Sequence, residues 1–217
     1  MRLDTKGTIL DAAERLFADE GFAAVSLRDI TTAAGVNLAA VNYHFGSKDA
    51  LIAELFVLRA TAINRERNAL LHAAERRAGP PALREVLRAL LDPPLRWWLG
   101  ADPAKSTTVR FIVRAIAEGA PEIRATMESQ VGHLQRFVVA LARTLPALSH
   151  AEICWRLHFA MGVMHHTIGD RKRLDALSTG ACDYGDVDLV VDRMVEFTAA
   201  GFEAPARAAL AHAPLAG

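Results

Sequence analysis

The side chains best placed to take part in chemistry lie between Ser26 and Leu51. Lys48 falls in the first turn of an expected helix, where the helix dipole disfavours a cation, so its position suggests an anionic partner such as phosphate. Ala39 and Ala40 stand near the start of the preceding helix, and such small residues allow a helix to enter a major groove closely. The chemistry that this stretch favours is therefore recognition of a nucleic acid.

Two short helices around a glycine turn must position these residues. Ser26 followed by Asp29 is a capping box and predicts the start of the first helix. Gly35 supplies the left-handed conformation that ends this helix, and the short polar side chain of Asn37 caps the next one. The apolar residues of the second helix follow the spacing i, i+3, i+7: Leu38, Val41 and Phe45. The remaining side chains of that helix therefore turn sideways or outward.

This order of a helix, a glycine turn, a short helix with Tyr and His, and then Gly-Ser-Lys-Asp resembles the DNA-binding head of the tetracycline-repressor (TetR) family of bacterial regulators. The resemblance implies two sets of DNA-contacting residues. The positions that match phosphate contacts are Ser26, Tyr43, His44 and Lys48. The positions at or near base edges, together with the cap of the second helix, are Arg28, Asn37, Leu38, Ala39, Ala40 and Asn42.

One position departs from the family pattern. Many members carry a second tyrosine where this chain has Asn42. An asparagine can hydrogen-bond adenine through two bonds at once. The base preference of this chain is therefore expected to differ from that of members with the second tyrosine.

The charge of the chain does not by itself predict DNA binding. Lys and Arg together number 25, as do Asp and Glu, and residues 1–50 hold five basic and seven acidic residues. A DNA-binding surface ordinarily carries a positive patch. The positions of the basic residues support DNA binding instead, because Arg28, His44 and Lys48 stand in the motif. The acidic residues of the first helix need not face DNA: Asp11, Glu14, Asp19 and Glu20.

Beyond this region the sequence is helical throughout, with no alternating strand pattern and no internal repeat. The expected fold class is all-α, with a three-helix helix-turn-helix domain at residues 1–50 and a larger helical ligand-binding and dimerisation domain at residues 51–217. A helix from Ser47 to about Glu75 links the two. Interruptions are expected at the proline-containing segments 79–81, 92–94 and 119–121, followed by a long helix from Glu122 to Leu145.

The last two long helices, which begin near Ser149 and Val187, are apolar on several sides. A helix of this kind must bury more than one face. One interpretation is a pair of core helices in a monomer. The interpretation that we favour, as the TetR resemblance implies, packs them internally on one side and against a second copy on the other. A homodimer also fits a pseudo-palindromic operator on double-stranded DNA, whose half-sites lie about one helical turn apart.

Large apolar side chains are concentrated in the middle of the second domain, next to an expected proline break. We expect a ligand cavity there because the break makes close packing harder, the alternative being an ordinary packed core. The segments LRWWLG, RFVVALARTLP and WRLHFAMGVMHHT also resemble TetR-type regulators that respond to fatty acids or acyl-CoA, which implies a small apolar effector. The expected pocket residues are Trp97, Trp98, Arg110, Phe111, Arg114, Phe137, Trp155 and Phe159.

A catalytic or metal site is the main rival interpretation. His158, His165 and His166 lie near Cys154 and Asp170 in the sequence, but no paired carboxylate completes a metal sphere. No phosphate-binding loop, nucleophile elbow or zinc-protease motif occurs. We therefore expect no enzyme activity, no metal and no cofactor.

The sequence thus predicts a ligand-responsive transcriptional regulator, and specifically a repressor that a small apolar effector releases from its operator. The alternative is a helical homodimeric adaptor, or a small-molecule-binding protein, without sequence-specific DNA binding. No apolar run approaches the roughly 20 residues needed to span a bilayer, and the N-terminal segment lacks a signal-peptide pattern. We therefore expect a cytoplasmic protein without a membrane partner.

Overall fold

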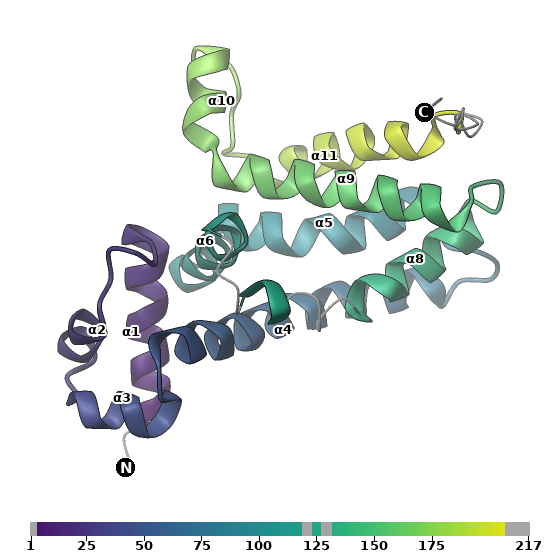
Figure 1. Ribbon diagram of the computed structural model, residues 1–217. Helices are drawn as coiled ribbons and strands as arrows, with labels where there is room; N and C mark the ends of the chain where they lie inside the picture. The colour runs from purple at the N-terminus through teal and green to yellow at the C-terminus, as the bar shows by residue number, and fades with distance from the viewer. Residues whose placement is uncertain (1–3, 119–122, 127–131, 207–217) are drawn as a thin grey trace, which may run out of the picture.

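The computed structural model describes residues 4–118, 123–126 and 132–206, and its labelled elements are all α-helices (Figure 1). Three helices form the head: α1 (Thr5–Glu20), α2 (Leu27–Ala34) and α3 (Leu38–Phe45). The others form the C-terminal domain: α4 (Lys48–Glu75), α5 (Leu83–Leu99), α6 (Pro103–Glu118), α8 (Gly132–Thr144), α9 (His150–Gly169), α10 (Arg171–Ser178) and α11 (Val187–Glu203). The described residues contain no strand, so the predicted all-α class is confirmed.

The head forms as its caps predict. The Ser26 hydroxyl oxygen accepts from the backbone N–H of Asp29 at 3.3 Å, and the Asp29 carboxylate accepts from the backbone N–H of Ser26 at 2.8 Å. Gly35 ends α2 with a φ of 65°, and the Asn37 side chain caps α3. Val41 and Phe45 of α3 face the core of the head, so the opposite face of the helix is turned outward. Leu38, expected on the apolar face by the same spacing, is 41% exposed, because it stands at the first position of α3, outside the apolar cluster of the head.

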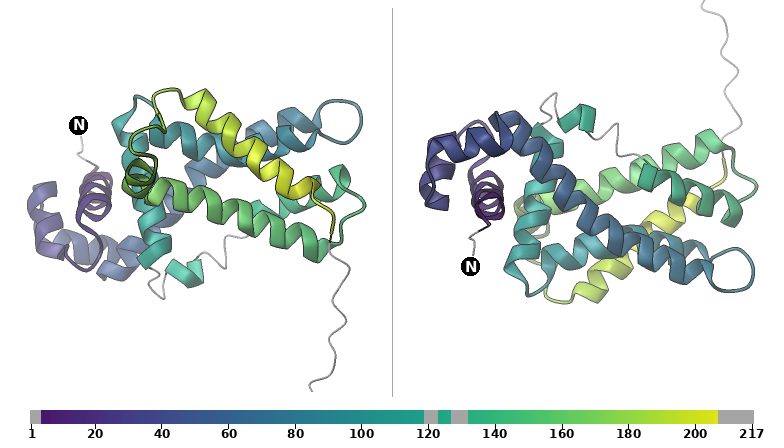
Figure 2. Two further views of the ribbon diagram at one scale, coloured as in Figure 1. Left: turned by 90° about the horizontal axis from the view of Figure 1, so that it is seen from above. Right: turned by 90° about the horizontal axis from the view of Figure 1, so that it is seen from below.

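Helix α4 joins the two domains. It begins after Ser47, whose hydroxyl oxygen accepts from the backbone N–H of Ala50 at 3.1 Å, and it runs for 28 residues away from the head (Figure 1). Figure 2 shows α4 on one face of the C-terminal domain and α9 with α11 on the opposite face. Helix α5 packs against both α4 and α11 and therefore forms the centre of this domain.

One predicted interruption is wrong, because Pro93 and Pro94 lie inside an unbroken α5. Proline has no N–H, so Pro94 leaves the carbonyl oxygen of Leu90 without its usual helical donor. The buried side chain of Arg67, on α4, replaces that donor, since its Nε donates to Leu90 O at 2.8 Å. Helix α5 continues because a neighbouring helix satisfies the carbonyl that the proline frees.

The helix expected from Glu122 to Leu145 is described only in part. Residues 123–126 are helical and α8 covers the later part, while the expected break at 119–121 lies outside the described residues. The two late apolar helices are confirmed as α9 and α11. Helix α10, which projects from the C-terminal domain in Figure 1, has no counterpart in the sequence prediction.

Helix α6 lies where the head meets the C-terminal domain. Its Phe111 is fully buried in the apolar cluster of the head, edge-on to Phe22 with a distance of 5.8 Å between ring centroids. Val109 and Val113 of the same helix belong to the core of the C-terminal domain. Helix α6 therefore contributes side chains to both cores and connects them directly.

Candidate DNA-binding surface and effector cavity

The outward face of α3 carries most of the residues expected to contact DNA. Tyr43 is 85% exposed and Leu38 is 41% exposed, although side chains of this size favour burial. The other α3 members of the expected set are exposed or half-buried: Ala39, Ala40, Asn42 and His44. A helix with this face free can approach a major groove without disturbing the core beneath it.

The remaining expected contacts stand at or near helix starts. Arg28, in the first turn of α2, is exposed. Ser26 donates its hydroxyl to the Asp29 carboxylate at 2.6 Å, and this bond is the main cause that lowers the pKa of Asp29. Asn37 accepts from Ala40 N–H at 2.9 Å through its side-chain oxygen, which leaves its amide N–H groups as donors. Ser26 and Asn37 can therefore contact DNA only with the groups that capping leaves available.

Lys48 points into the head and not outward. Its ammonium donates to the backbone oxygen of Phe22 and lies 5.9 Å from the ring centroid of Phe17. This carbonyl partner is a local reason for a lysine in the first turn of α4. A phosphate contact would therefore require Lys48 to leave the seam between α4 and the loop after α1.

Acidic residues of α1 face the C-terminal domain. Asp11 and Glu14 each lie 2.7 Å from Arg59 of α4, and Asp19 lies 2.6 Å from Arg110 of α6. These arginines neutralise carboxylates that would otherwise repel a nucleic acid. Three carboxylates of α1 are thus paired with arginines of the C-terminal domain.

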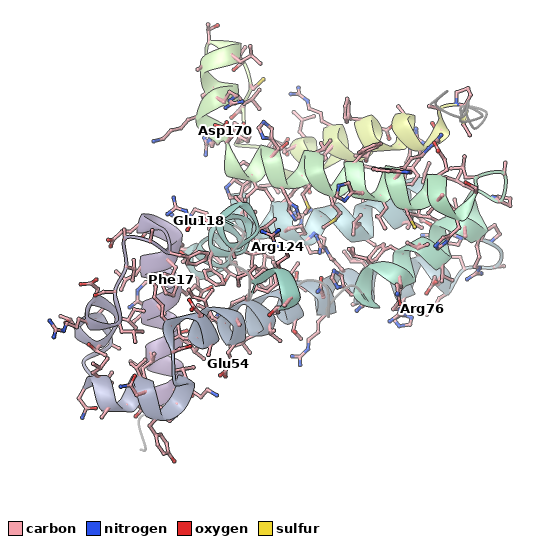
Figure 3. The ribbon with its side chains drawn as sticks, viewed as in Figure 1. Phe17, Glu54, Arg76, Glu118, Arg124 and Asp170 are labelled. Atoms are coloured by element: carbon pink, nitrogen blue, oxygen red, sulfur yellow. The ribbon has the colours of Figure 1, made fainter. Side chains whose placement is uncertain are left out.

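The same junction holds the head in place. Glu14 is buried and also accepts a hydrogen bond from Thr108 Oγ1 of α6 at 2.5 Å. The backbone N–H of Phe22 donates to Glu118 Oε2 of α6 at 3.0 Å, and Figure 3 shows Phe17 and Glu118 close to this junction. The position of the head is therefore set by α4 and α6.

A cavity of about 350 Å³ lies between α4, α6, α8 and α9. Its volume is within the range of small-molecule sites. Its apolar lining comprises Phe56, Ala60, Ile63, Pro94, Val109, Ile112, Val113, Ile116, Leu134, Met161, Met164 and Ile168. Its polar lining, among the described residues, comprises Asn64, Arg67, Arg124, His133 and His165. Such a cavity suits a mainly apolar ligand with a polar group.

Arg67 is the buried charge of this cavity. It is 6% exposed, and besides the α5 carbonyl it contacts Asn64 Oδ1 at 3.2 Å and Met164 Sδ at 3.6 Å. No carboxylate of the described residues pairs with Arg67, and burial lowers its pKa to about 10. Burial, followed by the charges of Arg67 and His158, lowers the pKa of His165 to about 4. The imidazole of His165 is therefore neutral at pH 7.

None of the eight predicted pocket residues is in the lining of this cavity. Phe111 and Phe137 are fully buried in packed clusters. Trp97 is buried with its indole N–H donating to Glu66 Oε2 at 2.8 Å, and Trp98 packs edge-on against a tyrosine ring. These four aromatic side chains fill packed regions of the chain.

The other four predicted pocket residues lie in two further places. Arg110 and Arg114 face the head, where Arg110 pairs with an aspartate of α1 and Arg114 Nη1 donates to Phe17 O at 3.5 Å. Trp155 and Phe159 stack on α9 with 5.6 Å between ring centroids, and they are 59% and 60% exposed. The predicted set is thus divided among the head junction, the cores and an exposed helix face.

Sequence reasoning missed Arg67, although the sequence carries a signal for it. Ile63, Arg67 and Leu71 are spaced four residues apart on one face of α4, and all three are buried. A charged residue inside such an apolar stripe must be buried with compensating groups or serve a ligand. The spacing of Arg67 therefore indicates a buried charge, which the density of aromatic residues does not.

The histidines considered as a metal or catalytic site do not converge. His165 lines the cavity, whereas His158 and His166 are exposed. Within the described residues, no group of three His, Cys, Asp or Glu side chains is arranged to hold a metal ion. In the same part of the chain, no helix has both the length and the apolar character required to cross a membrane.

Comparison with known proteins agrees with this arrangement of a head and a helical domain. Residues 9–55 match the family described as "Bacterial regulatory proteins, tetR family", and residues 88–201 match "Tetracyclin repressor-like, C-terminal domain". The chain belongs to the TetR family. It is a helix-turn-helix transcriptional regulator and not an enzyme.

Relatives of this TetR-family chain include the HTH-type transcriptional repressor Rv3405c of Mycobacterium tuberculosis (strain ATCC 25618 / H37Rv). The two are 33% identical over 165 residues, which cover 74% of this chain and 76% of the relative. The transcriptional regulator FadR from Bacillus subtilis, solved in complex with stearoyl-CoA, has a TM-score of 0.64 at 15% identity, covering 90% of this chain and 98% of that one. The superantigen PfiT has a TM-score of 0.65 at 17% identity, covering 89% and 95%. At these identities the two structures show the fold alone.

Proposed function

We propose that this TetR-family protein is a homodimeric repressor that binds a pseudo-palindromic operator through residues 1–50 and is released by a small apolar effector bound within residues 51–217. The observation that carries the proposal is that α4 and α6 both line the cavity and hold the head. Thr108 of α6 bonds to Glu14 of the head, and the next residue, Val109, lines the cavity.

An effector would act through these two helices. A ligand that binds one arrangement of α4 and α6 more tightly shifts the population toward that arrangement. The two α3 helices of a dimer then change their separation and no longer fit successive major grooves together. A coupling free energy of about 1 to 3 kcal/mol would weaken operator binding roughly 5- to 150-fold.

Exposed aromatic residues support the homodimer. Trp155 and Phe159 of α9 and Phe197 of α11 are each more than half exposed, and Phe197 reaches 68%. Apolar side chains gathered on one face mark interaction surfaces. A second copy that covers α9 and α11 would bury them and bring two heads onto one operator.

Two observations support a fatty acid or acyl-CoA as the effector class. The cavity is lined mainly by aliphatic side chains and methionines, which suit a flexible chain. The structural neighbour FadR was solved with stearoyl-CoA. An apolar chain is therefore the ligand portion that we assign to this cavity.

The experiment that tests the DNA-binding part removes one exposed arginine at a time. Arg28→Ala should make the slope of log binding constant against log salt concentration about one unit shallower, because it removes one positive charge from the DNA interface. The matched control is Arg76→Ala, at the far end of α4 (Figure 3), which removes the same charge and should leave the slope unchanged. Fluorescence anisotropy with a duplex selected by the parent protein from a random library measures both.

Equal slopes for the two variants would remove Arg28 from the DNA interface. A parent protein that selects no duplex, yet binds a small apolar ligand, would instead favour the alternative function. That alternative is a helical homodimeric adaptor or small-molecule-binding protein without sequence-specific DNA binding.

A further inference from the structure

We propose that the ligand of the cavity is an organic acid with an apolar tail and a single negative charge, and that its carboxylate binds the guanidinium of Arg67. This inference rests on the effector site of the proposed function and names the head-group chemistry of its ligand. It also assigns the polar contact to one side chain.

The described residues leave the charge of Arg67 unneutralised. Its Nε donates to Leu90 O at 2.8 Å and its Nη1 to Asn64 Oδ1 at 3.2 Å, and both acceptors are uncharged. Its Nη2 has the thioether sulfur of Met164 at 3.6 Å, which is a weak acceptor. Nη2 is therefore the donor best placed to take a stronger acceptor such as a carboxylate oxygen.

The surroundings of Arg67 suit an anion with a tail. None of the described residues that line the cavity is acidic, and most of the lining is aliphatic. A buried cation without a counter-ion is unfavourable, so a carboxylate that enters the cavity gains a charge-assisted hydrogen bond as it neutralises Arg67. Arg124 also lines the cavity (Figure 3), but its side chain is exposed and water weakens its attraction for an anion.

The charge of the site favours a single negative charge on the ligand. His165 is neutral at pH 7 because burial and the charge of Arg67 lower its pKa to about 4, so it adds a hydrogen-bonding group and no second cation. A phosphate monoester carries nearly two negative charges and would be left partly unneutralised. In an acyl-CoA the group at the end of the acyl chain is an uncharged thioester, and the phosphates lie a pantetheine arm away from it, so an acyl chain seated in the cavity brings no anion to Arg67. A free carboxylic acid matches both the apolar walls and the one buried cation.

The test compares three ligands that share a ten-carbon chain: decanoate, 1-decanol and decanoyl-CoA. Isothermal titration calorimetry measures their affinities for the full-length protein. We expect decanoate to bind about 10- to 100-fold more tightly than 1-decanol, as a buried charge-assisted hydrogen bond provides. Arg67→Gln should abolish this preference and leave the affinity for 1-decanol within about threefold of the parent.

Two more variants control for stability and position. Arg67→Lys keeps the cation and should retain part of the preference for decanoate, while Arg124→Gln removes the other arginine of the cavity and should retain all of it. The affinity of each variant for 1-decanol reports whether its cavity is still formed.

The outcomes separate this inference from the proposed function. Equal affinity of the parent for decanoate and 1-decanol, or a preference for decanoyl-CoA, overturns the head-group assignment and leaves the effector site standing. A decanoate preference that survives Arg67→Gln, or that Arg124→Gln removes, shows that Arg67 is not the contact. If none of the three ligands binds, or if a bound ligand leaves DNA affinity unchanged, the effector role itself is wrong.

Discussion

Two charged side chains, Glu14 at the head junction and Arg67 in the cavity, are buried to the same 6% exposure but have opposite kinds of partner. Glu14 accepts from Arg59 Nε at 2.9 Å and from Thr108 Oγ1 at 2.5 Å, so both of its oxygens are bonded and its charge is neutralised. Arg67 has only uncharged acceptors among the described residues. A buried charge that is paired with a counter-ion of the same chain can hold helices together. A buried charge that lacks such a counter-ion can instead bind a ligand of opposite charge.

The two sites lie on the same pair of helices. Arg59 and Arg67 are eight residues, about two turns, apart on α4, and Thr108 and Val109 are adjacent on α6. Arg59 and Thr108 each bond to Glu14 of the head, whereas Arg67 and Val109 line the cavity. A ligand that displaced the cavity wall, as in the proposed function, would therefore act on the helices that position the head.

The largest effect is expected at Arg59. Arg59→Met keeps much of the side-chain volume but leaves the Glu14 carboxylate buried without a cation, so the free energy of unfolding should fall by about 3 kcal/mol. Urea denaturation at one fixed protein concentration measures the change. The control is Arg110→Met, which breaks an ion pair with side chains 43% and 57% exposed and should cost less than about 1 kcal/mol. Similar losses in both variants would contradict the role given to Arg59.

An effect of intermediate size is expected at His165 on acidification. Burial first, and then the charge of Arg67, lower the folded-state pKa of His165 to about 4, below an ordinary value of about 6.5. The unfolded chain binds a proton as the pH falls below about 6.5, and the folded chain does so only near pH 4. Stability is therefore full above this window and is lost as the pH falls through it, by roughly 2 to 3 kcal/mol.

The contribution of His165 to the pH dependence of stability can be separated from those of other groups by urea denaturation. The midpoints of the parent and of His165→Gln are compared between about pH 4 and pH 7. The parent should lose more stability than the variant as the pH falls. Arg67→Gln should also reduce the loss, because it removes one cause of the lowered pKa. Parallel curves for the parent and His165→Gln would mean that His165 titrates normally in the folded chain.

The smallest effect is expected between Arg67 and Pro94. Arg67→Met should leave Leu90 O without a donor, and Pro94→Ala restores the backbone N–H that bonds to it in a regular helix. The double variant should therefore be more stable than the sum of the single changes predicts, by about 1 kcal/mol. Urea denaturation of the four proteins measures this coupling. Pro93→Ala is the control, because its N–H would meet a different carbonyl; equal coupling there would refute the assignment.

The local structure of the head follows from the sequence because each of its features depends on residues a few positions apart. The capping box at Ser26, the turn at Gly35 and the cap at Asn37 all form bonds within about one helical turn. The spacing of Val41 and Phe45 decides which face of α3 is buried for the same reason. The predicted outward set on α3 therefore needed no knowledge of the C-terminal domain.

The cavity could not be placed in the same way, because its lining depends on which faces of distant helices meet. Periodicity groups Arg110, Phe111 and Arg114 on α6 but does not say that they face the head. Density of aromatic residues likewise does not distinguish a buried Trp97 from a Trp155 that is left exposed on α9. Helix packing determines both the direction in which the α6 side chains face and which tryptophan is buried, because the contacts of a side chain depend on which helices lie beside it.

The sequence by itself determined the TetR family, the all-α class and the outward face of α3, because these depend on helix caps and periodicity along one stretch of chain. Only the tertiary structure decided which buried charges are neutralised. Arg59 reaches Glu14 across 45 residues of chain, and Arg67 reaches Leu90 O across 23. Such contacts depend on how α4 packs against α1 and α5, and packing geometry is a property of the assembled helices.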